Sequence, residues 1–111
     1  MPVGLRDLGR QDIKYAVIDV SNTTGTLVAA VAGKKITVVS YCVGCESNST
    51  IVFLSNTTAL TGAMPPRASG DSFIECGWNP DGHFQTASGE ALKMTHTGSN
   101  NARGHLTYFE C

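Results

Sequence analysis

Short runs of strand-forming residues, separated by turn residues at fairly even spacing, constrain this chain more than any other feature. The runs are rich in Val, Ile and Thr, and the segments between them are rich in Gly, Asn, Ser and Pro, which favour turns. We expect strands at residues 13–20, 26–31, 35–43, 50–54, 58–64, 72–76, 83–86, 91–97 and 105–110. This pattern predicts an all-β protein, either an antiparallel β-sandwich or a barrel.

The alternation of residue types supports these strands. Leu92, Met94 and His96 are predicted to lie on one face of the segment 91–97, with Lys93 and Thr95 on the other, as in a half-buried antiparallel strand. The run 36–43 has apolar residues at both parities, which predicts cover on both faces. The segment 27–33 contains three alanines, but its valines and its lack of a cap favour a strand over a helix.

The length of 111 residues suits one domain. Residues 1–12 are mostly polar, contain one proline and two glycines, and show no helical period. We expect them to form an extended N-terminal arm, either disordered or ordered against another chain, and residues 13–111 to form the sandwich. The candidate contact residues of the arm are Val3, Leu5, Arg6, Leu8 and Arg10.

Charged residues are sparse, at 15% of the chain, and the net charge is −1. A soluble domain usually has about a quarter, so we expect a surface that neighbouring molecules partly cover. The basic residues are scattered, which argues against a nucleic-acid partner. No apolar run approaches the roughly 20 residues of a membrane helix, and the start does not resemble a signal peptide, so synthesis in a cytoplasm is expected.

Four cysteines, Cys42, Cys45, Cys76 and Cys111, are the most suggestive chemical feature. Cys42 and Cys45 have the C-x-x-C spacing, and Gly44 would permit the turn of a zinc knuckle. A structural zinc site needs a second close pair, which Cys76 and Cys111 do not provide, and no helix follows to activate a redox thiol. We interpret the four as buried thiols or structural disulfides, with zinc as the alternative, and we predict no cofactor.

The pattern of titratable and nucleophilic residues does not indicate an enzyme. His83, His96 and His105 lack metal-binding spacing, and we expect His96 and His105 to be neighbours on strands paired around the loop 98–104. Asp71 and Glu75 could flank a cleft, but a domain of this size rarely forms one alone. The sequence has neither a nucleophile elbow nor a phosphate-binding glycine pattern, so we predict no catalytic activity.

Three stretches resemble small virion-associated proteins of tailed bacteriophages. They are Thr-Leu-Val-Ala-Ala-Val-Ala-Gly-Lys-Lys-Ile at 26–36, Asn-Pro-Asp-Gly-His-Phe-Gln-Thr-Ala-Ser-Gly-Glu-Ala-Leu at 79–92, and Gly-His-Leu-Thr-Tyr-Phe-Glu at 104–110. The resemblance covers residues 14–110 and implies a single β-sandwich after a short N-terminal segment. The ending Gly-x-Leu-x-Tyr is also similar to the last strand of trimeric jelly rolls of the tumour-necrosis-factor and complement type. With this likeness, the expected fold is a single antiparallel β-sandwich that is jelly-roll-like. The cysteines depart from the pattern, because aliphatic and small residues usually follow Lys-Lys-Ile.

This resemblance implies a capsid decoration, or cement, protein, which binds the assembled shell from outside and holds neighbouring capsomers together. We therefore expect a homotrimer that contacts the major capsid protein on the virion surface, after synthesis in the host bacterial cytoplasm. No membrane or nucleic-acid partner is expected. The alternative is a carbohydrate- or receptor-binding module of a tail fibre or baseplate. Its candidate aromatic residues are Trp78, Phe84, Tyr41 and Tyr108, although core packing or an intersubunit contact is the preferred interpretation.

Overall fold

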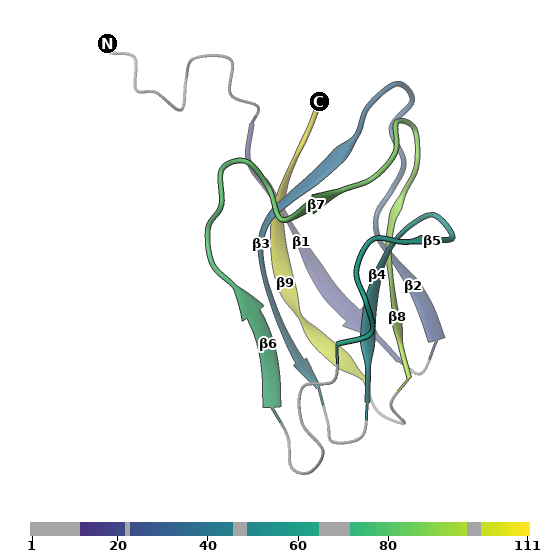
Figure 1. Ribbon diagram of the computed structural model, residues 1–111, viewed down its shortest axis with the longest axis vertical. Coiled ribbons are helices and arrows are strands. Elements are labelled where there is room, and N and C mark those ends of the chain that lie inside the picture. The colour runs from purple at the N-terminus through teal and green to yellow at the C-terminus, as the bar shows by residue number, and fades with distance from the viewer. Residues whose placement is uncertain (1–11, 22, 46–48, 65–71, 98–100) are drawn as a thin grey trace.

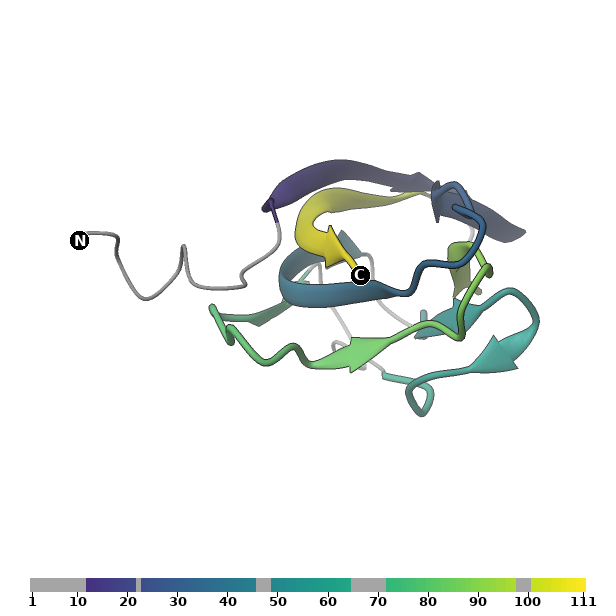
Figure 2. The same cartoon turned by 90° about the horizontal axis from the view of Figure 1, so that it is seen from above.

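The computed structural model describes residues 12–21, 23–45, 49–64, 72–97 and 101–111, and every regular element in these ranges is a β-strand. Nine strands form two antiparallel sheets that pack against each other as a β-sandwich (Figures 1 and 2). The expected all-β sandwich is therefore confirmed. The expected arm lies outside the described residues, except for Asp12.

The larger sheet, here called sheet A, has five strands. Its order runs from β1 (Lys14–Val20) at one edge through β9 (Ala102–Glu110) and β3 (Ile36–Cys45) to β6 (Ser72–Cys76) at the other edge. The short β7 (Phe84–Gln85) also pairs with β3, through Thr37 and Val38. The start and the end of the sandwich therefore lie side by side in one sheet.

The smaller sheet, sheet B, has four strands in the order β2 (Thr23–Val28), β8 (Leu92–His96), β4 (Ile51–Ser55) and β5 (Thr58–Ala59). The alternation predicted for β8 is confirmed, because Leu92, Met94 and His96 are buried while Lys93 and Thr95 are half-buried. Phe53 of β4 pairs with Met94 and is likewise fully buried.

The strand pairs are nested, which gives the sandwich a jelly-roll topology. When β7 is set aside, the first strand pairs with the last, the second with the last but one, and so on inward: β1 with β9, β2 with β8, β3 with β6 and β4 with β5. One long antiparallel ribbon rolled into two sheets has this pairing. Each sheet therefore combines strands from both halves of the sequence.

The hydrophobic core fills the space between the two sheets. It receives inward-facing residues of both sheets, as expected for aligned sheet packing, and each is at most 7% exposed. Its members are Ile18, Val20, Val28, Ile36, Val38, Tyr41, Val43, Cys45, Ile51, Phe53, Leu92, Met94, Ala102 and Leu106.

Several strand boundaries differ from those predicted. Thr23 to Gly25, expected as a turn, begin β2 because they pair with His96, Thr95 and Met94 of β8. The same strand ends at Val28, so Ala29 to Val31 are not in it. β5 contains only residues 58 and 59 of the predicted 58–64. Pairing with neighbouring strands overrides the local turn preference of Thr-Thr-Gly.

Full burial on both faces, predicted for the whole run 36–43, is found only in the first half of β3. Ile36 to Val39 are each at most 3% exposed, whereas the residues from Ser40 to Cys45 alternate between buried and half-buried. A register shift between Val38 and Ser40 opposite β9 marks a bulge. The bulge adds Val39 to the buried set.

Candidate assembly interface

Four large hydrophobic side chains in the described part of the chain are more than a third exposed. Tyr15 is 80% exposed, Val17 72%, Trp78 52% and Ile13 36%. Ile13, Tyr15 and Val17 alternate along β1 and the residue before it, and we call them the β1 strip. Trp78 comes two residues after the end of β6. The exposed apolar side chains therefore lie at the two opposite edges of sheet A.

The β1 strip arises because β1 is apolar on both faces. Ile18 and Val20 point into the core, so the alternation of a strand directs Tyr15 and Val17 to solvent. Among the described strands only β9 pairs with β1, which leaves its other edge open. Natural edge strands are usually protected by charges or bulges, and an apolar edge marks a contact surface.

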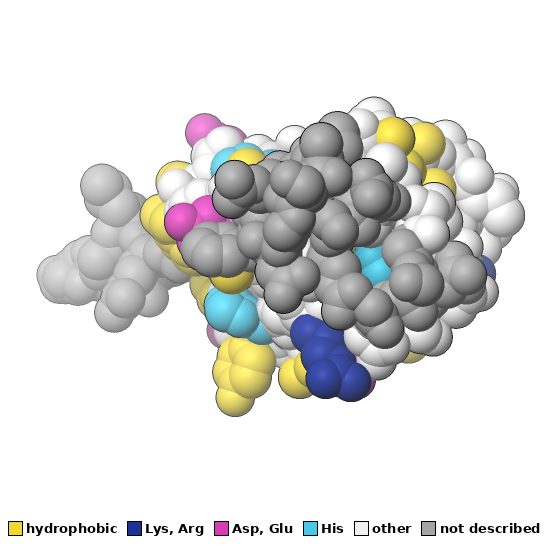
Figure 3. Space-filling model, turned by 90° about the horizontal axis from the view of Figure 1, so that it is seen from below, with side chains coloured by type: hydrophobic (Ala, Val, Ile, Leu, Met, Phe, Trp, Pro, Cys, Tyr) yellow, Lys and Arg dark blue, Asp and Glu magenta, His cyan; other side chains and the backbone are white. Residues whose placement is uncertain are grey.

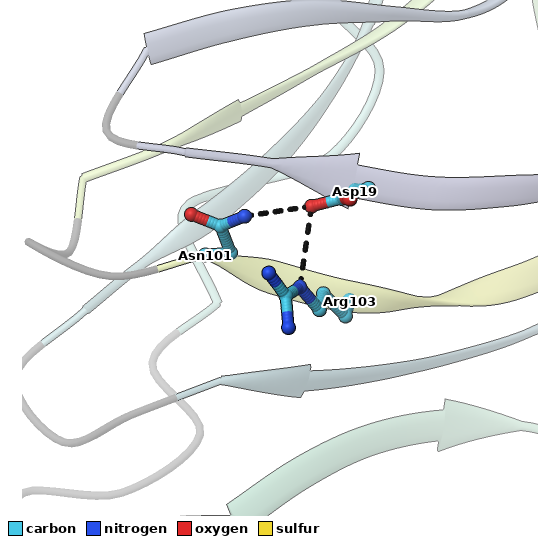
Figure 4. A network of polar contacts seen from close by, with 3 residues as sticks. All are labelled: Asp19, Asn101 and Arg103. Carbon is cyan, nitrogen blue, oxygen red and sulfur yellow. Dashed lines mark hydrogen bonds and ion pairs between the residues drawn. The ribbon is translucent and has the colours of Figure 1, made fainter.

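A polar network lies next to the β1 strip, near the end of β1 (Figure 4). The carboxylate of Asp19 accepts a hydrogen bond from Asn101 Nδ2 at 2.8 Å, and Nε of Arg103 lies 3.4 Å from the same oxygen. The side chains of Arg103 and Asp19 are 72% and 54% exposed, so this ion pair adds little stability. In Figure 3 hydrophobic side chains lie beside a basic side chain at the margin of the molecule.

Trp78 lies next to a well-anchored turn. Oδ1 of Asn79 accepts a hydrogen bond from the Asp81 amide at 3.0 Å, and Nδ2 of Asn79 donates to the Gly82 carbonyl at 3.2 Å. The Asn79 amide donates to the carbonyl of Val39 in β3 at 2.9 Å. Gly82 has a φ of 89°, a left-handed conformation that favours glycine. These bonds fix the backbone beside the exposed indole.

The other aromatic candidates belong to the core rather than to the surface around Trp78. The ring centroid of Phe84 lies 4.9 Å from that of Phe53 and 5.9 Å from that of Tyr41. Tyr41 is only 6% exposed, and Tyr108 packs partly buried against the same cluster. Trp78 is thus the one aromatic candidate of the sequence prediction that is largely exposed.

The C-x-x-C pair does not form a knuckle. Cys42 and Cys45 both lie in β3, at positions of opposite parity, so they point to opposite faces of sheet A. Cys45 is buried and Cys42 half-buried. The zinc-knuckle turn considered at Gly44 is therefore absent, because pairing of β3 with β6 and β9 keeps the residue in an extended strand.

The remaining cysteines are separate from that pair. All four cysteines lie within the described ranges and all four are free thiols, with Cys111 exposed at the end of β9. Cys76 donates from Sγ to the hydroxyl of Tyr41 at 3.3 Å. Burial raises the pKa of the Tyr41 hydroxyl, and the Cys76 thiol raises it further. Burial likewise raises the pKa of Cys45, although a hydrogen bond with Ser49 partly opposes this.

The histidines do not meet, and the expectation that His96 and His105 are neighbours on paired strands is wrong. His96 lies in β8 of sheet B and is 1% exposed, whereas His105 lies exposed in β9 of sheet A. Ala102 to Gly104, expected as part of a loop, instead begin β9 by pairing with β1. His83 bonds to the Gly77 carbonyl through Nε2 at 2.7 Å.

The described residues contain neither a metal-holding group nor a helix that could span a membrane. Among them no group of three or more His, Cys, Asp and Glu is placed to hold a metal ion. Within the same ranges no helix is long and apolar enough to cross a membrane. Of the two carboxylates considered for a cleft, Glu75 is exposed on β6, and Asp71 lies outside the described residues.

Comparison with known proteins gives no relative for this chain. No protein-family model, curated protein or solved structure matches it. The candidate interface is therefore inferred from the exposed edges of sheet A alone.

The structure adds residues that the sequence interpretation missed, and leaves others undescribed. Tyr15 and Val17 were not recognised as a surface, although the segment 13–20 carries a signal: both of its parities are apolar, unlike those of 91–97. The predicted arm contacts lie outside the described residues. They are Val3, Leu5, Arg6, Leu8 and Arg10.

Proposed function

We propose that this chain is a structural virion protein of a tailed bacteriophage, which binds the outside of the capsid and bridges neighbouring capsomers as a homotrimer. The observation that carries the proposal is the β1 strip. Tyr15 and Val17 are 80% and 72% exposed on a strand whose outer edge has no described partner. Such an edge supports association with another protein surface.

The jelly-roll topology supports this role without assigning it. Viral coat proteins and lectins both use double-sheet jelly rolls, and one fold serves many functions. The exposed edge, the low charge of the surface and the likeness of 26–36, 79–92 and 104–110 to virion-associated proteins together favour the virion role. The role requires no catalytic group and no cofactor.

The size of the β1 strip indicates how the protein attaches. Full burial of one aromatic side chain removes about 150–250 Å² from water, so the strip provides roughly 300 Å². A stable interface needs about 800 Å² per partner. One strip is therefore too small by itself, and a trimer that presents three arms to the shell gains affinity through multivalency.

The arm is proposed as the capsid contact, because it directly precedes Ile13 in the sequence and carries apolar and basic residues. In this arrangement Val3, Leu5 and Leu8 contact apolar surface of the major capsid protein. Arg6 and Arg10 supply the charged part of the contact.

The test is co-sedimentation of the purified full-length protein with empty capsids of its own phage. We expect saturable binding, and we expect shells with bound protein to resist heat or chelation better than bare shells. A variant with Val3→Ser, Leu5→Ser and Leu8→Ser should bind at least tenfold more weakly, while Thr58→Ala, an exposed residue of β5, serves as the matched control.

Wild-type protein that is folded but does not sediment with these capsids would contradict the proposed function. Equal binding by the arm variant and the control would contradict the arm contact alone. Circular dichroism of each variant establishes that it is folded.

A further inference from the structure

We propose that copies of this chain join head to tail, with the β1 strip of one copy against the Trp78 edge of the next. The Trp78 edge is Trp78 together with the turn 79–82. The number of subunits in the closed ring, three, rests on the proposed function. The partner of the β1 strip is a second copy of this chain, and the arm binds the capsid.

The directions of the edge strands suit this arrangement. Each neighbouring pair along β1, β9, β3 and β6 is antiparallel, so β1 and β6 run in opposite directions at the two edges. When β1 of one copy lies beside β6 of another, the antiparallel alternation continues. The contact is heterologous, and repetition of a heterologous contact produces a closed ring when its rotation closes.

The two edges also match in height along the strands. Lys14 of β1 pairs with Tyr108 of β9, which pairs with Val38 of β3. On the far side of β3, the His83 amide donates to the Val38 carbonyl at 2.7 Å and the Asn79 amide donates to the Val39 carbonyl at 2.9 Å. The Trp78 edge therefore lies level with the start of β1. Copies need a rotation about an axis along the strands, with no shift, to bring the edges together.

The side chains at that height are complementary. Tyr15 and Trp78 are the most exposed aromatic side chains among the described large hydrophobic residues, at 80% and 52%. Nζ of Lys14, the residue before Tyr15, is already paired with Glu110 at 2.8 Å, so the complementarity lies in the aromatic side chains. A head-to-tail contact thus places aromatic on aromatic.

A head-to-tail ring covers both apolar edges, whereas a two-fold pairing of β1 with β1 would leave Trp78 exposed. In a ring, each subunit contributes its β1 strip to one junction and its Trp78 edge to the other. Each subunit is therefore held by two junctions at once, and closure of the ring makes the last contact intramolecular.

The test is native mass spectrometry of the full chain and of two complementary variants. The β1-edge variant carries Tyr15→Asp and Val17→Asp, and the Trp78-edge variant carries Trp78→Asp. We expect the wild type to be a trimer at micromolar concentration and each variant alone to be a monomer. All three residues are more than half exposed, so the variants are expected to fold, which circular dichroism checks. Thr58→Asp, on β5 of sheet B, is the control and should stay trimeric.

The decisive sample is an equimolar mixture of the two variants. Each variant keeps the edge that the other has lost, so one intact junction remains and a heterodimer should appear. A monomeric wild type, a Trp78-edge variant that still assembles, or a mixture without heterodimer would each overturn the head-to-tail contact. Specific glycan binding that depends on Trp78, in a protein whose assembly does not, would also overturn it.

Capsid co-sedimentation of the same samples separates this inference from the proposed function. A wild type that binds capsids as a monomer retains the capsid-binding role, and it refutes both the ring and the trimeric state. A trimer that forms through these edges but does not bind capsids supports the ring and refutes the function.

Discussion

Replacement of Gly104 by alanine should separate two central strands of sheet A. A Cβ at this position would lie inside contact distance of the Cys42 carbonyl oxygen, 2.9 Å from the Cys42 carbonyl carbon and 3.0 Å from Cα of Val43. These atoms belong to the backbone of β3, so rotation of a side chain cannot relieve the overlap. Gly104→Ala must therefore displace β9 from β3 or distort both.

The expected loss of stability follows from overpacking. Inserting a group into a filled site costs about 1–3 kcal/mol, and displacement of backbone from backbone belongs at the upper end. Replacing a glycine also restricts the unfolded chain, which raises the free energy of unfolding by about 0.4–1 kcal/mol and offsets part of this loss. The net loss should be about 2–2.5 kcal/mol, which at roughly 4 °C per kcal/mol lowers Tm by about 10 °C.

Gly44→Ala is the matched control, because Gly44 lies in β3 one register pair away from Gly104. A Cβ there would lie 3.5 Å from the Arg103 carbonyl oxygen, an ordinary contact. We expect Gly44→Ala to change stability by less than about 1 kcal/mol, in either direction. Urea unfolding followed by circular dichroism, at one protein concentration because assembly adds stability, measures both variants. Free energies of unfolding that agree within about 1 kcal/mol would refute the steric reasoning.

Three further predictions concern the turn at Gly82, the buried hydroxyl and the thiols. Gly82→Ala should cost about 1–3 kcal/mol in urea unfolding, because φ is 89° and a Cβ would overlap a side chain of β3, whereas Gly62→Ala, with open space around it, should be neutral. Above about pH 10 the protein should lose stability, because burial raises the pKa of Tyr41 above its ordinary value of 10.0. As the pH rises, the unfolded state releases this proton before the folded state does, so the stability that the hydroxyl contributes is present below pH 10 and lost above it. The free energy of unfolding of Tyr41→Phe should therefore fall less steeply with rising pH. Iodoacetamide should label Cys111 first and Cys45 last, because Cys111 is exposed while Cys45 is buried with a raised pKa.

Each of these three predictions would be contradicted by a specific result. Equal stability of the Gly82 and Gly62 variants would show that the turn tolerates a side chain. Identical alkaline unfolding of the wild type and Tyr41→Phe would show that the hydroxyl is not the titrating group. Labelling of Cys45 before Cys111, followed by peptide mass spectrometry, would contradict the burial of Cys45.

The number of strands and the fold class follow from the sequence because they depend on local chemistry. Turn residues end each apolar run, and the period of two along 91–97 assigns Leu92, Met94 and His96 to one face. All nine expected strands occur, with shifted ends, and the predicted sandwich is confirmed. Local patterning of this kind needs no knowledge of which strand pairs with which.

Strand ends and strand partners depend on contacts between distant residues, which local patterns do not encode. Thr23 to Gly25 and Ala102 to Gly104 join strands because β8 and β1 offer them partners. For the same reason the sequence misplaced His105, whose neighbours are in β1 and β3 rather than in β8.

The candidate interface was decided by tertiary structure alone. The sequence shows that the segment 13–20 is a strand with apolar side chains on both faces, either of which could be buried. It also shows that Trp78 lies beside a turn. Only the jelly-roll order places β1 and β6 at opposite edges of one sheet, and there Tyr15, Val17 and Trp78 are each more than half exposed. The exposure of a side chain depends on what packs against it, and that is determined by the pairing of strands that lie far apart in the chain.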